Sequence, residues 1–388
     1  MKLLDLPFLA EITTIRRDIH AHPELAFEES RTADVVARAL ESYGIEVHRG
    51  LAGTGVVGVI KGTQGTSSRM VGLRADMDAL PMPELNEFPH RSRHAGKMHA
   101  CGHDGHTAML LGAARYLSEY RDFDGTVVLI FQPAEEGEGG AHVMIEQGLF
   151  KQFPVEAVFG LHNWPGLPVG QMAIMPGPVM AGTCGLEILI RGHGCHAAMP
   201  HQGVDTILVG TVVVQALQSV VSRNLHPCEA AVVSVTQFHA GDAWNVIPED
   251  AVLRGTIRTF KQEVQQLVET RIQEICTGIA ATYGAQIEVR FESRYPPTVN
   301  SPAEAHFCQQ VAAELLGGSH VVKDALPSMG AEDFAYMLLE KPGCYVWLGN
   351  GPGEGGCTLH NPHYDFNDDI TAIGISYWVQ LARDSLAK

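Results

Sequence analysis

One thiol and three imidazoles lie within the short stretch His99–His106, which reads His-Ala-Cys-Gly-His-Asp-Gly-His. Cys101 and His103 are two residues apart, so their side chains share a face in an extended loop. A helical pattern begins just after them, and soft donors at such a junction suit a borderline metal such as Zn, Mn, Co or Ni. A structural zinc site brings cysteines in CxxC pairs, and the sequence contains none, so further ligands must come from elsewhere.

Acidic and histidine side chains also follow predicted strands elsewhere in the chain. Glu135 and Glu136 come after an apolar strand at 126–131, and His162 comes after one at 155–159. Because ligands of open α/β sheets gather beyond the carboxyl ends of the strands, we expect these side chains at one edge of a sheet. A later loop adds a histidine, and the candidate metal donors are then Cys101, His103, Glu136, His162 and His360.

Five donors are more than one closed tetrahedral zinc requires, and they predict a centre of two divalent ions with positions left for water. One glutamate of the pair can bind metal while its neighbour takes a proton from the attacking water and gives it to the leaving nitrogen. The spacing of Glu135 and Glu136 leaves open which residue does which. The donor set favours amide hydrolysis by a metal-bound water.

The elements that position these residues alternate between apolar strands and helices, which predicts an α/β fold with a helix-covered sheet. The predicted strands are 55–60, 70–74, 126–131, 155–159 and 344–349. The predicted helices are 8–20, 30–43, 104–120, 139–147, 302–316 and 369–386.

The pattern changes near residue 183, where the strands become alternating rather than continuously apolar. A strand at 185–191 is followed by a helix at 204–223, strands at 230–239 and 251–259, a helix at 261–283 and a strand at 286–291. This β-α-β-β-α-β order predicts a small ferredoxin-like α+β module inserted into the larger domain. We therefore expect a larger domain of residues 1–183 plus 295–388, which carries the candidate metal donors, and an inserted domain of residues 184–294.

The overall charge argues against two classes of partner. With 27 Lys and Arg against 44 Asp and Glu, the net charge is −17, which disfavours nucleic acid and anionic membranes. The eight scattered cysteines and an N-terminal segment without a signal-peptide layout predict a cytoplasmic protein. The most apolar run, Ile207–Val221, is interrupted by Gln215 and Gln218, and we interpret it as a buried helix face.

A series of motifs between about His20 and Asp369 resembles the amidohydrolase branch of the aminoacylase and carboxypeptidase-G metallopeptidase family. The motifs are Arg74-Ala-Asp-Met-Asp-Ala-Leu-Pro, Met98-His-Ala-Cys-Gly-His-Asp-Gly-His-Thr-Ala, Gln132-Pro-Ala-Glu-Glu-Gly, Gly160-Leu-His, His196-Ala-Ala-Met-Pro-His, Asn245-Val-Ile-Pro, Gly255-Thr-Ile-Arg-Thr, Gly330-Ala-Glu-Asp-Phe and Leu359-His. That branch includes hippurate hydrolases and N-acyl-amino-acid amidohydrolases.

The resemblance implies a zinc-exopeptidase-like catalytic domain with an inserted lid that often mediates dimerisation. It assigns Glu135 as general base and acid, and it places Asp78 behind the ligands as an orienting partner. It assigns the two-metal centre to Cys101, His103, Glu136, His162 and His360.

The resemblance also implies roles for four residues of the lid and of a later loop. In the wider family a lid histidine that matches His196 can reach the partner subunit's site and steady the oxyanion. Asn245, Arg258 and Gly330 match positions that hold substrate, and an arginine suits a bidentate grip on a carboxylate. Whether His196 acts in its own subunit or in the partner stays open.

We therefore expect a cytoplasmic, metal-dependent amidohydrolase that cleaves small N-acyl amino acids, with hippurate-like and N-acetyl compounds first. A dipeptidase or N-carbamoyl amino acid amidohydrolase on the same scaffold is the alternative. A metal-binding regulator would need the water-activating carboxylate to be absent, and Glu135 is present. A hydrolase with Cys101 as nucleophile would tolerate chelators but not alkylation. The expected assembly is a homo-oligomer, a dimer or tetramer, through the lid.

Overall fold

The computed structural model describes residues 1–352 and 357–388, which form two compact units. The first unit comprises Met1–Val179, Val299–Leu326 and Asp333–Lys388. The second comprises Met180–Thr298 and the short segment Pro327–Glu332, and so it is inserted into the first. These limits differ by a few residues from those expected at 184 and 294, and the segment 327–332 was not expected in the insertion. The role of the second unit as a lid stays a prediction.

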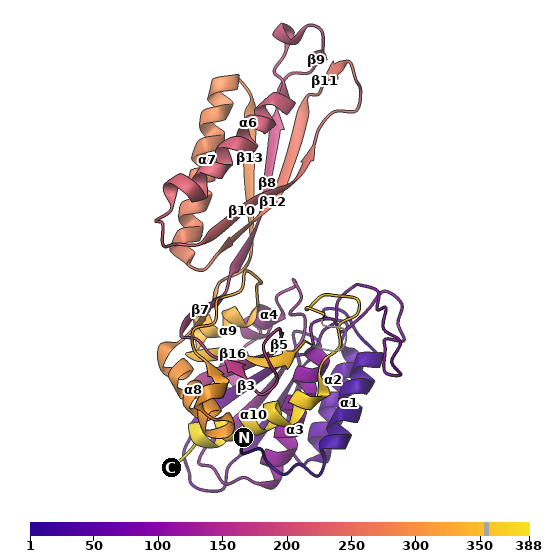
Figure 1. Cartoon of the computed structure of the whole chain (residues 1–388), viewed down its shortest axis with the longest axis vertical. Coiled ribbons are helices and arrows are strands. Elements are labelled where there is room, and N and C mark those ends of the chain that lie inside the picture. The colour runs from indigo at the N-terminus through magenta and orange to yellow at the C-terminus, as the bar shows by residue number, and fades with distance from the viewer. Residues whose placement is uncertain (353–356) are drawn as a thin grey trace. The chain divides into compact units, whose positions relative to one another are not determined.

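The first unit is built on a mixed sheet whose strands include β3, β5 and β16 (Figure 1). The sheet has eight strands in the order β1-β2-β4-β3-β5-β16-β6-β15. The strands are β1 Glu46–Leu51, β2 Gly55–Lys61, β3 Met70–Asp76, β4 Thr126–Gln132, β5 Ala157–Pro165, β6 Met172–Ala173, β15 Val321–Val322 and β16 Gly343–Gly351. The central strands β4, β3, β5 and β16 run parallel, whereas β2 is antiparallel to β4 and β6 to β16. The predicted mixed α/β fold class is confirmed.

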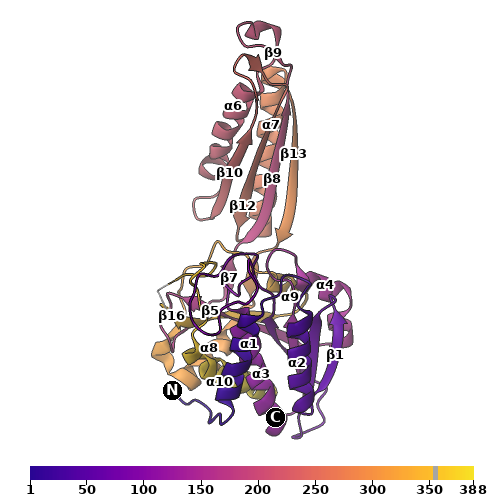
Figure 2. The ribbon, with the colours of Figure 1, turned by 90° about the vertical axis from the view of Figure 1, so that its right-hand side faces the viewer.

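The helices of this unit are α1 Leu9–Ala21, α2 Ser30–Ser42, α3 His103–Glu119, α4 Gly140–Glu146, α5 Leu149–Gln152, α8 Pro302–Leu316, α9 Phe334–Glu340 and α10 Thr371–Ser385. Helix α3 packs against α1, α2 and α10 (Figure 2). Short 3-10 helices lie at Gly318–His320 and Asp368–Ile370, and β7 Gly177–Met180 pairs with β14 Thr298–Asn300.

Side chains alternate between the two faces along the central strands, so the apolar side chains of the core and the polar side chains near the metal donors lie on opposite faces of the sheet. Val71, Leu73 and Ala75 of β3 are buried in one hydrophobic core with apolar residues of α2, α3, α8 and α10. Arg74 and Asp76 are buried too, but they point to the other face of the sheet. Polar groups are thus gathered on the face that α4 and α9 contact.

All the elements predicted for this unit are present, and their ends differ modestly from the expected ones. The largest difference is in β5, which continues to Pro165, so His162 lies within the strand and not after it. Strands β1, β6 and β15 were not predicted. β1 is a largely exposed edge without an apolar alternation, and β6 and β15 have two residues each.

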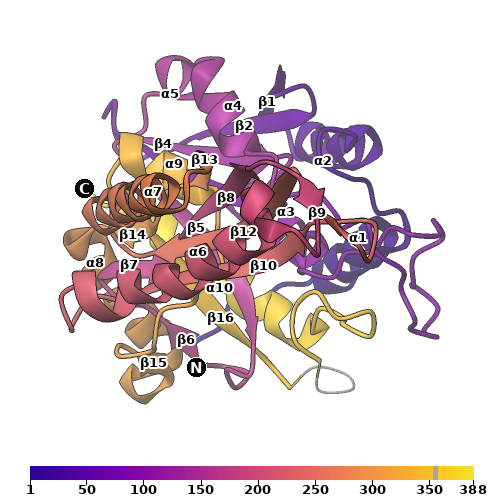
Figure 3. The same cartoon turned by 90° about the horizontal axis from the view of Figure 1, so that it is seen from above.

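The second unit contains a four-stranded antiparallel sheet with the order β10-β12-β8-β13. Its elements are β8 Gly182–Arg191, β9 Cys195–His196, a 3-10 turn Pro200–Gln202, α6 Thr206–Ser219, a π-helical turn Val220–Asn224, β10 Ala231–His239, β11 Val246–Ile247, β12 Asp250–Thr259, α7 Gln262–Tyr283 and β13 Gln286–Tyr295. Helices α6 and α7 lie side by side over one face of this sheet (Figure 3), where they enclose a separate hydrophobic core.

Helix α6 and the turn after it form the one segment in the described chain that is long and apolar enough to cross a membrane, judged by length and composition alone. One face of it buries Val209, Val213 and Leu217 in the core of the second unit, in agreement with the predicted buried face. The other face leaves Ile207 and Leu208 exposed by 44% and 51%.

Candidate metal centre

The start of α3 delivers two of the predicted ligands. Cys101 lies in the turn before the helix and His103 is its first residue, with Gly102 between them at φ 94°. A side chain at Gly102 would collide with the Asn163 amide, because a Cβ atom there would lie 2.2 Å from Oδ1. Glycine is therefore required both for the left-handed backbone and for the close approach of this turn to β5.

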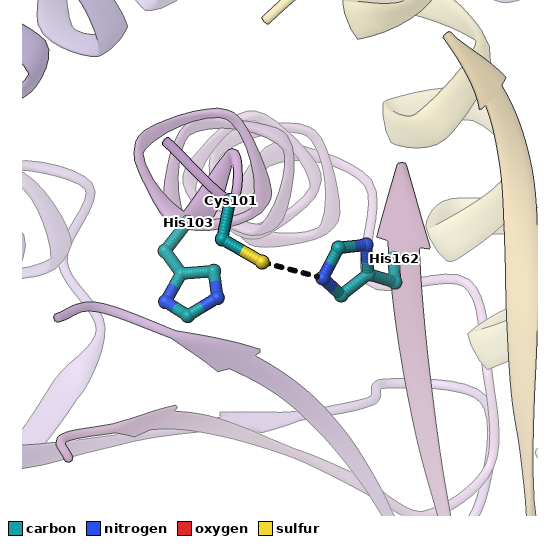
Figure 4. Close-up of side chains that lie close together, drawn as sticks. All are labelled: Cys101, His103 and His162. Atoms are coloured by element: carbon teal, nitrogen blue, oxygen red, sulfur yellow. Dashed lines mark hydrogen bonds between the residues drawn. The ribbon is translucent and has the colours of Figure 1, made fainter. Parts of the chain in front are cut away.

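A first group of three donors forms where this turn meets β5. The donor atoms of Cys101, His103 and His162 all lie within 4.8 Å of one another, and the three side chains converge in Figure 4. Cys101 Sγ is 3.3 Å from His162 Nε2. Two donors bound to one tetrahedral zinc ion lie about 3.4 Å apart, given ligand distances near 2.1 Å. The spacing in this group therefore fits a shared ion.

His103 presents a nitrogen that is suited to a metal. Its Nδ1 lies 3.2 Å from Asp78 Oδ1, so a proton on Nδ1 leaves the Nε2 lone pair free. Nε2 is buried and makes no hydrogen bond within the described residues. Carboxylate oxygens of Asp76, Glu135 and Glu136 surround it at 3.7, 3.9 and 3.9 Å, which is too far for hydrogen bonds but suitable for donors around a cation.

A second group of donors contains Cys101, Glu136 and His360, again within 4.8 Å of one another. His360 Nε2 is 3.3 Å from Glu136 Oε1, and the His360 backbone N–H donates to the Ala100 carbonyl oxygen at 2.8 Å. Cys101 belongs to both groups, so its sulfur would be available to an ion held in either of them. All five metal donors predicted from the sequence thus come together in the first unit.

The charges of this site also favour bound cations. Burial, reinforced by Glu136 and Glu135, raises the pKa of the Cys101 thiol well above its usual range. Burial opposes protonation of His103, but the carboxylates of Asp76, Asp78 and Glu136 outweigh it and raise the pKa of this imidazole to about 10, so a cation bound at Nε2 would take the place of a proton there. A site that holds so much negative charge away from water is stabilised by a divalent ion, which also allows the thiol to ionise.

Three buried residues behind the ligands were not predicted as part of the site, namely Asp76, His106 and Asn163. His106 Nδ1 lies 2.6 Å from Asp76 Oδ1, and its Nε2 lies 2.7 Å from Asn163 Oδ1. Asp76, His103 and His106 also have ligand atoms within 4.8 Å of one another. Because both His106 nitrogens already have partners, we interpret His106 as a support for the neighbouring residues and not as a ligand. Its position three residues after His103 on α3 was the available signal.

The remaining predicted residues lie in the second unit. His196 on β9 pairs with Val246 of β11, and the Ala197 N–H donates to the Asn245 carbonyl oxygen at 3.0 Å, so His196 and Asn245 are neighbours. Arg258 lies near the other end of β12, where it pairs with Thr183. The eight-residue offset from Asp250 corresponds to roughly 26 Å of strand.

Gly330 is exposed, and its carbonyl oxygen accepts from the Ala181 N–H at 3.0 Å. The structure thus brings His196 and Asn245 together, but it does not bring Arg258 to them within this unit.

Comparison with known proteins identifies the family of the chain. Residues 72–384 match the model of peptidase family M20/M25/M40. The chain belongs to this family. A hippurate hydrolase of Campylobacter jejuni is 42% identical to this M20-family hydrolase over 381 residues, which cover 98% of this chain and 97% of the relative. An N-acetylcysteine deacetylase of Bacillus subtilis is 39% identical over 383 residues, with 98% of each chain covered.

Among solved structures, a dinuclear metal-binding M20 peptidase of Bacillus subtilis superposes with a TM-score of 0.86 at 36% identity, covering 98% of this chain and 99% of the other. The predicted family resemblance is confirmed. The dinuclear character of this relative agrees with the two donor groups that share Cys101. The identity of the metal in this M20-family hydrolase stays a prediction.

Proposed function

We propose that this M20-family hydrolase cleaves the amide bond of N-acyl amino acids to a carboxylic acid and a free amino acid. The observation that carries the proposal is the pair of donor groups joined at Cys101, with the carboxylate of Glu135 beside them. The hippurate hydrolase and N-acetylcysteine deacetylase relatives support this substrate class.

In this proposal Cys101, His103, Glu136, His162 and His360 hold two divalent ions drawn from Zn, Mn, Co and Ni. When bound, such a pair polarises the amide carbonyl and lowers the pKa of a coordinated water molecule. Asp78 orients the centre, since one of its oxygens faces His103 Nδ1 and the other accepts the Glu136 N–H at 2.9 Å. Glu135, which is 6% exposed, takes the water proton and delivers it to the leaving nitrogen.

We propose roles in substrate recognition for the residues of the second unit. His196 steadies the developing oxyanion, while Asn245, Arg258 and Gly330 hold the amino-acid part of the substrate. The guanidinium of Arg258 is a suitable partner for its carboxylate, because it donates through two parallel N–H groups.

We propose that the chain forms a homo-oligomer, a dimer or a tetramer, through the second unit. β10 is an edge strand of the four-stranded sheet, and an unpaired edge favours pairing with another chain. The exposed Ile207 and Leu208 of α6 add apolar surface in the same unit. Sedimentation equilibrium should give at least twice the chain mass of 42.0 kDa. A single-chain mass at micromolar concentration would contradict this assembly.

A cytoplasmic location is also a proposal. All eight cysteines are free thiols, which fits a reducing compartment. Cell fractionation of the native host would test it, and recovery of the protein outside the cytoplasm would be the contrary result.

A panel of small substrates tests the reaction. We expect the enzyme with two bound metal ions to hydrolyse N-benzoylglycine and N-acetyl amino acids at least tenfold faster, in kcat/KM, than dipeptides or N-carbamoyl amino acids. Release of free amino acid is the readout. A preference for dipeptides or for N-carbamoyl amino acids would move the assignment to another amide class on the same scaffold.

A further inference from the structure

The loop that carries Glu135 and Glu136 is fastened by three carboxylates from distant parts of the chain. Glu29 Oε1 accepts the Ala134 N–H at 2.8 Å, Asp78 Oδ2 accepts the Glu136 N–H at 2.9 Å, and Asp333 Oδ2 accepts the Ala141 N–H at 2.8 Å. Asp78 also faces a metal ligand, and Asp333 also pairs with Arg74 at 3.1 Å. Among the described residues, Glu29 makes neither a contact with a metal ligand nor an ion pair with Arg74, so the burial of its carboxylate needs a separate explanation.

Glu29 is fully buried, and its side chain makes hydrogen bonds to residues of the first unit. Oε1 accepts from the backbone N–H of Ala134 at 2.8 Å and of Phe27 at 3.1 Å, while Oε2 accepts from the Thr54 hydroxyl at 2.6 Å. Glu29 immediately precedes α2, yet its side chain makes no capping hydrogen bond to that helix. Helix capping therefore does not account for the buried carboxylate.

The two backbone partners of Oε1 share an unusual conformation. Ala134 has φ 56° and Phe27 has φ 61°, and they are two of the four non-glycine residues with positive φ in the described chain. Such residues keep a left-handed conformation only where their surroundings hold them in it. Glu29 Oε1 therefore holds the backbone N–H groups of two residues in strained conformations, and one of them, Ala134, immediately precedes Glu135.

We propose that Glu29 is a positioning residue, which fixes the Ala134 peptide and thereby aims the carboxylate of Glu135 at the metal centre. This inference rests on the role of Glu135 in the proposed function. The direction of the Glu135 side chain depends on the backbone rotation at Ala134, because the two residues share a peptide bond. A general base displaced by about 1 Å loses much of its effect, even though the group that moved it lies away from the reacting atoms.

A glutamine at this position should preserve the arrangement. Its carbonyl oxygen can accept both N–H groups, and its amide can donate to the Thr54 hydroxyl, which rotates to accept. Burial raises the pKa of the Glu29 carboxyl to about 7, so an uncharged side chain of the same shape is compatible with the site. Alanine and methionine supply no acceptor.

The test compares E29A, E29M and E29Q with the matched control E24A. Glu24 also makes three hydrogen bonds at the start of α2, to the Arg31 N–H and to the N–H and hydroxyl of Thr32, but it does not bond the Glu135 loop. We expect E29A and E29M to lower kcat for N-benzoylglycine about tenfold, with KM and bound metal unchanged. E29Q should stay within about twofold of wild type, and E24A should lose thermal stability without losing kcat.

Three results would overturn the inference: wild-type kcat in whichever of E29A and E29M folds, an equal loss of kcat in E24A, or a loss in E29Q as large as in E29A. Wild-type enzyme and E135Q are measured in parallel. If wild-type enzyme cleaves no N-acyl amino acid, the proposed function fails. If wild-type enzyme cleaves N-acyl amino acids and E29A or E29M has the same kcat as wild type, only the proposed role of Glu29 fails.

Discussion

Replacing Glu135 with glutamine should lower kcat by about 10²-fold to 10⁴-fold and leave the metal content unchanged. The amide has the shape of the carboxylate but cannot take a proton from water. Glu135 is not one of the five expected ligands, although its carboxylate lies within 4.8 Å of the donor atoms of His103 and Glu136, so the ions should remain bound. Steady-state kinetics together with elemental analysis of the purified variant would show both effects.

Glu138 provides a matched control for this prediction. It lies on the same loop, is exposed, and belongs to none of the donor groups found among the described residues. Glu138→Gln should therefore retain wild-type kcat. Substantial turnover by E135Q would show that another group moves the proton, and loss of metal from E135Q would show that Glu135 is itself a ligand.

Removal of metal by a chelator should lower activity by about 10³-fold, and added Zn²⁺, Mn²⁺, Co²⁺ or Ni²⁺ should restore it. Such a loss corresponds to the several kcal/mol that a metal pair contributes to stabilising the transition state. The five donors come from segments as distant as Cys101 and His360, and they converge only in the folded chain. Activity before and after dialysis, with bound metal measured in each sample, tests this.

A thiol reagent distinguishes this reaction from catalysis by a cysteine nucleophile. Burial raises the pKa of Cys101, so without a cation it is a poor nucleophile. Cys228 is exposed, and Cys195 and Cys357 are partly exposed, so the triple variant C195S/C228S/C357S provides a background in which alkylation reports on the buried cysteines. In that background the metal-loaded enzyme should resist alkylation and remain active. Full activity in the presence of chelator would contradict the metal mechanism.

The metal donors could be found in the sequence because each lies in a short local pattern. Cys101 and His103 share one turn, Glu136 follows β4, His162 lies near the end of β5, and His360 lies in a turn well after β16. The sequence did not predict that His162 lies inside a strand, because no local pattern marks the true end of β5 at Pro165.

The groups that support the donors depend on contacts between distant segments. His106 meets Asp76 and Asn163 only because α3, β3 and β5 adopt one particular arrangement. Glu29 reaches Ala134 across 105 positions of the chain, and neither residue belongs to a pattern that suggests the other. Sequence periodicity identifies which face a residue occupies, but not which distant peptide it will meet.

The place of β16 in the sheet has a consequence for how the protein is made. β16 begins at Gly343 and is synthesised long after β5, which ends at Pro165, yet it lies beside β5 inside the sheet, between β5 and β6. Until residues 343–351 leave the ribosome, β5 therefore has an open edge toward its missing neighbour. A premature stop before Gly343 would not yield a shortened enzyme, but a fragment whose exposed strand invites aggregation with its own copies.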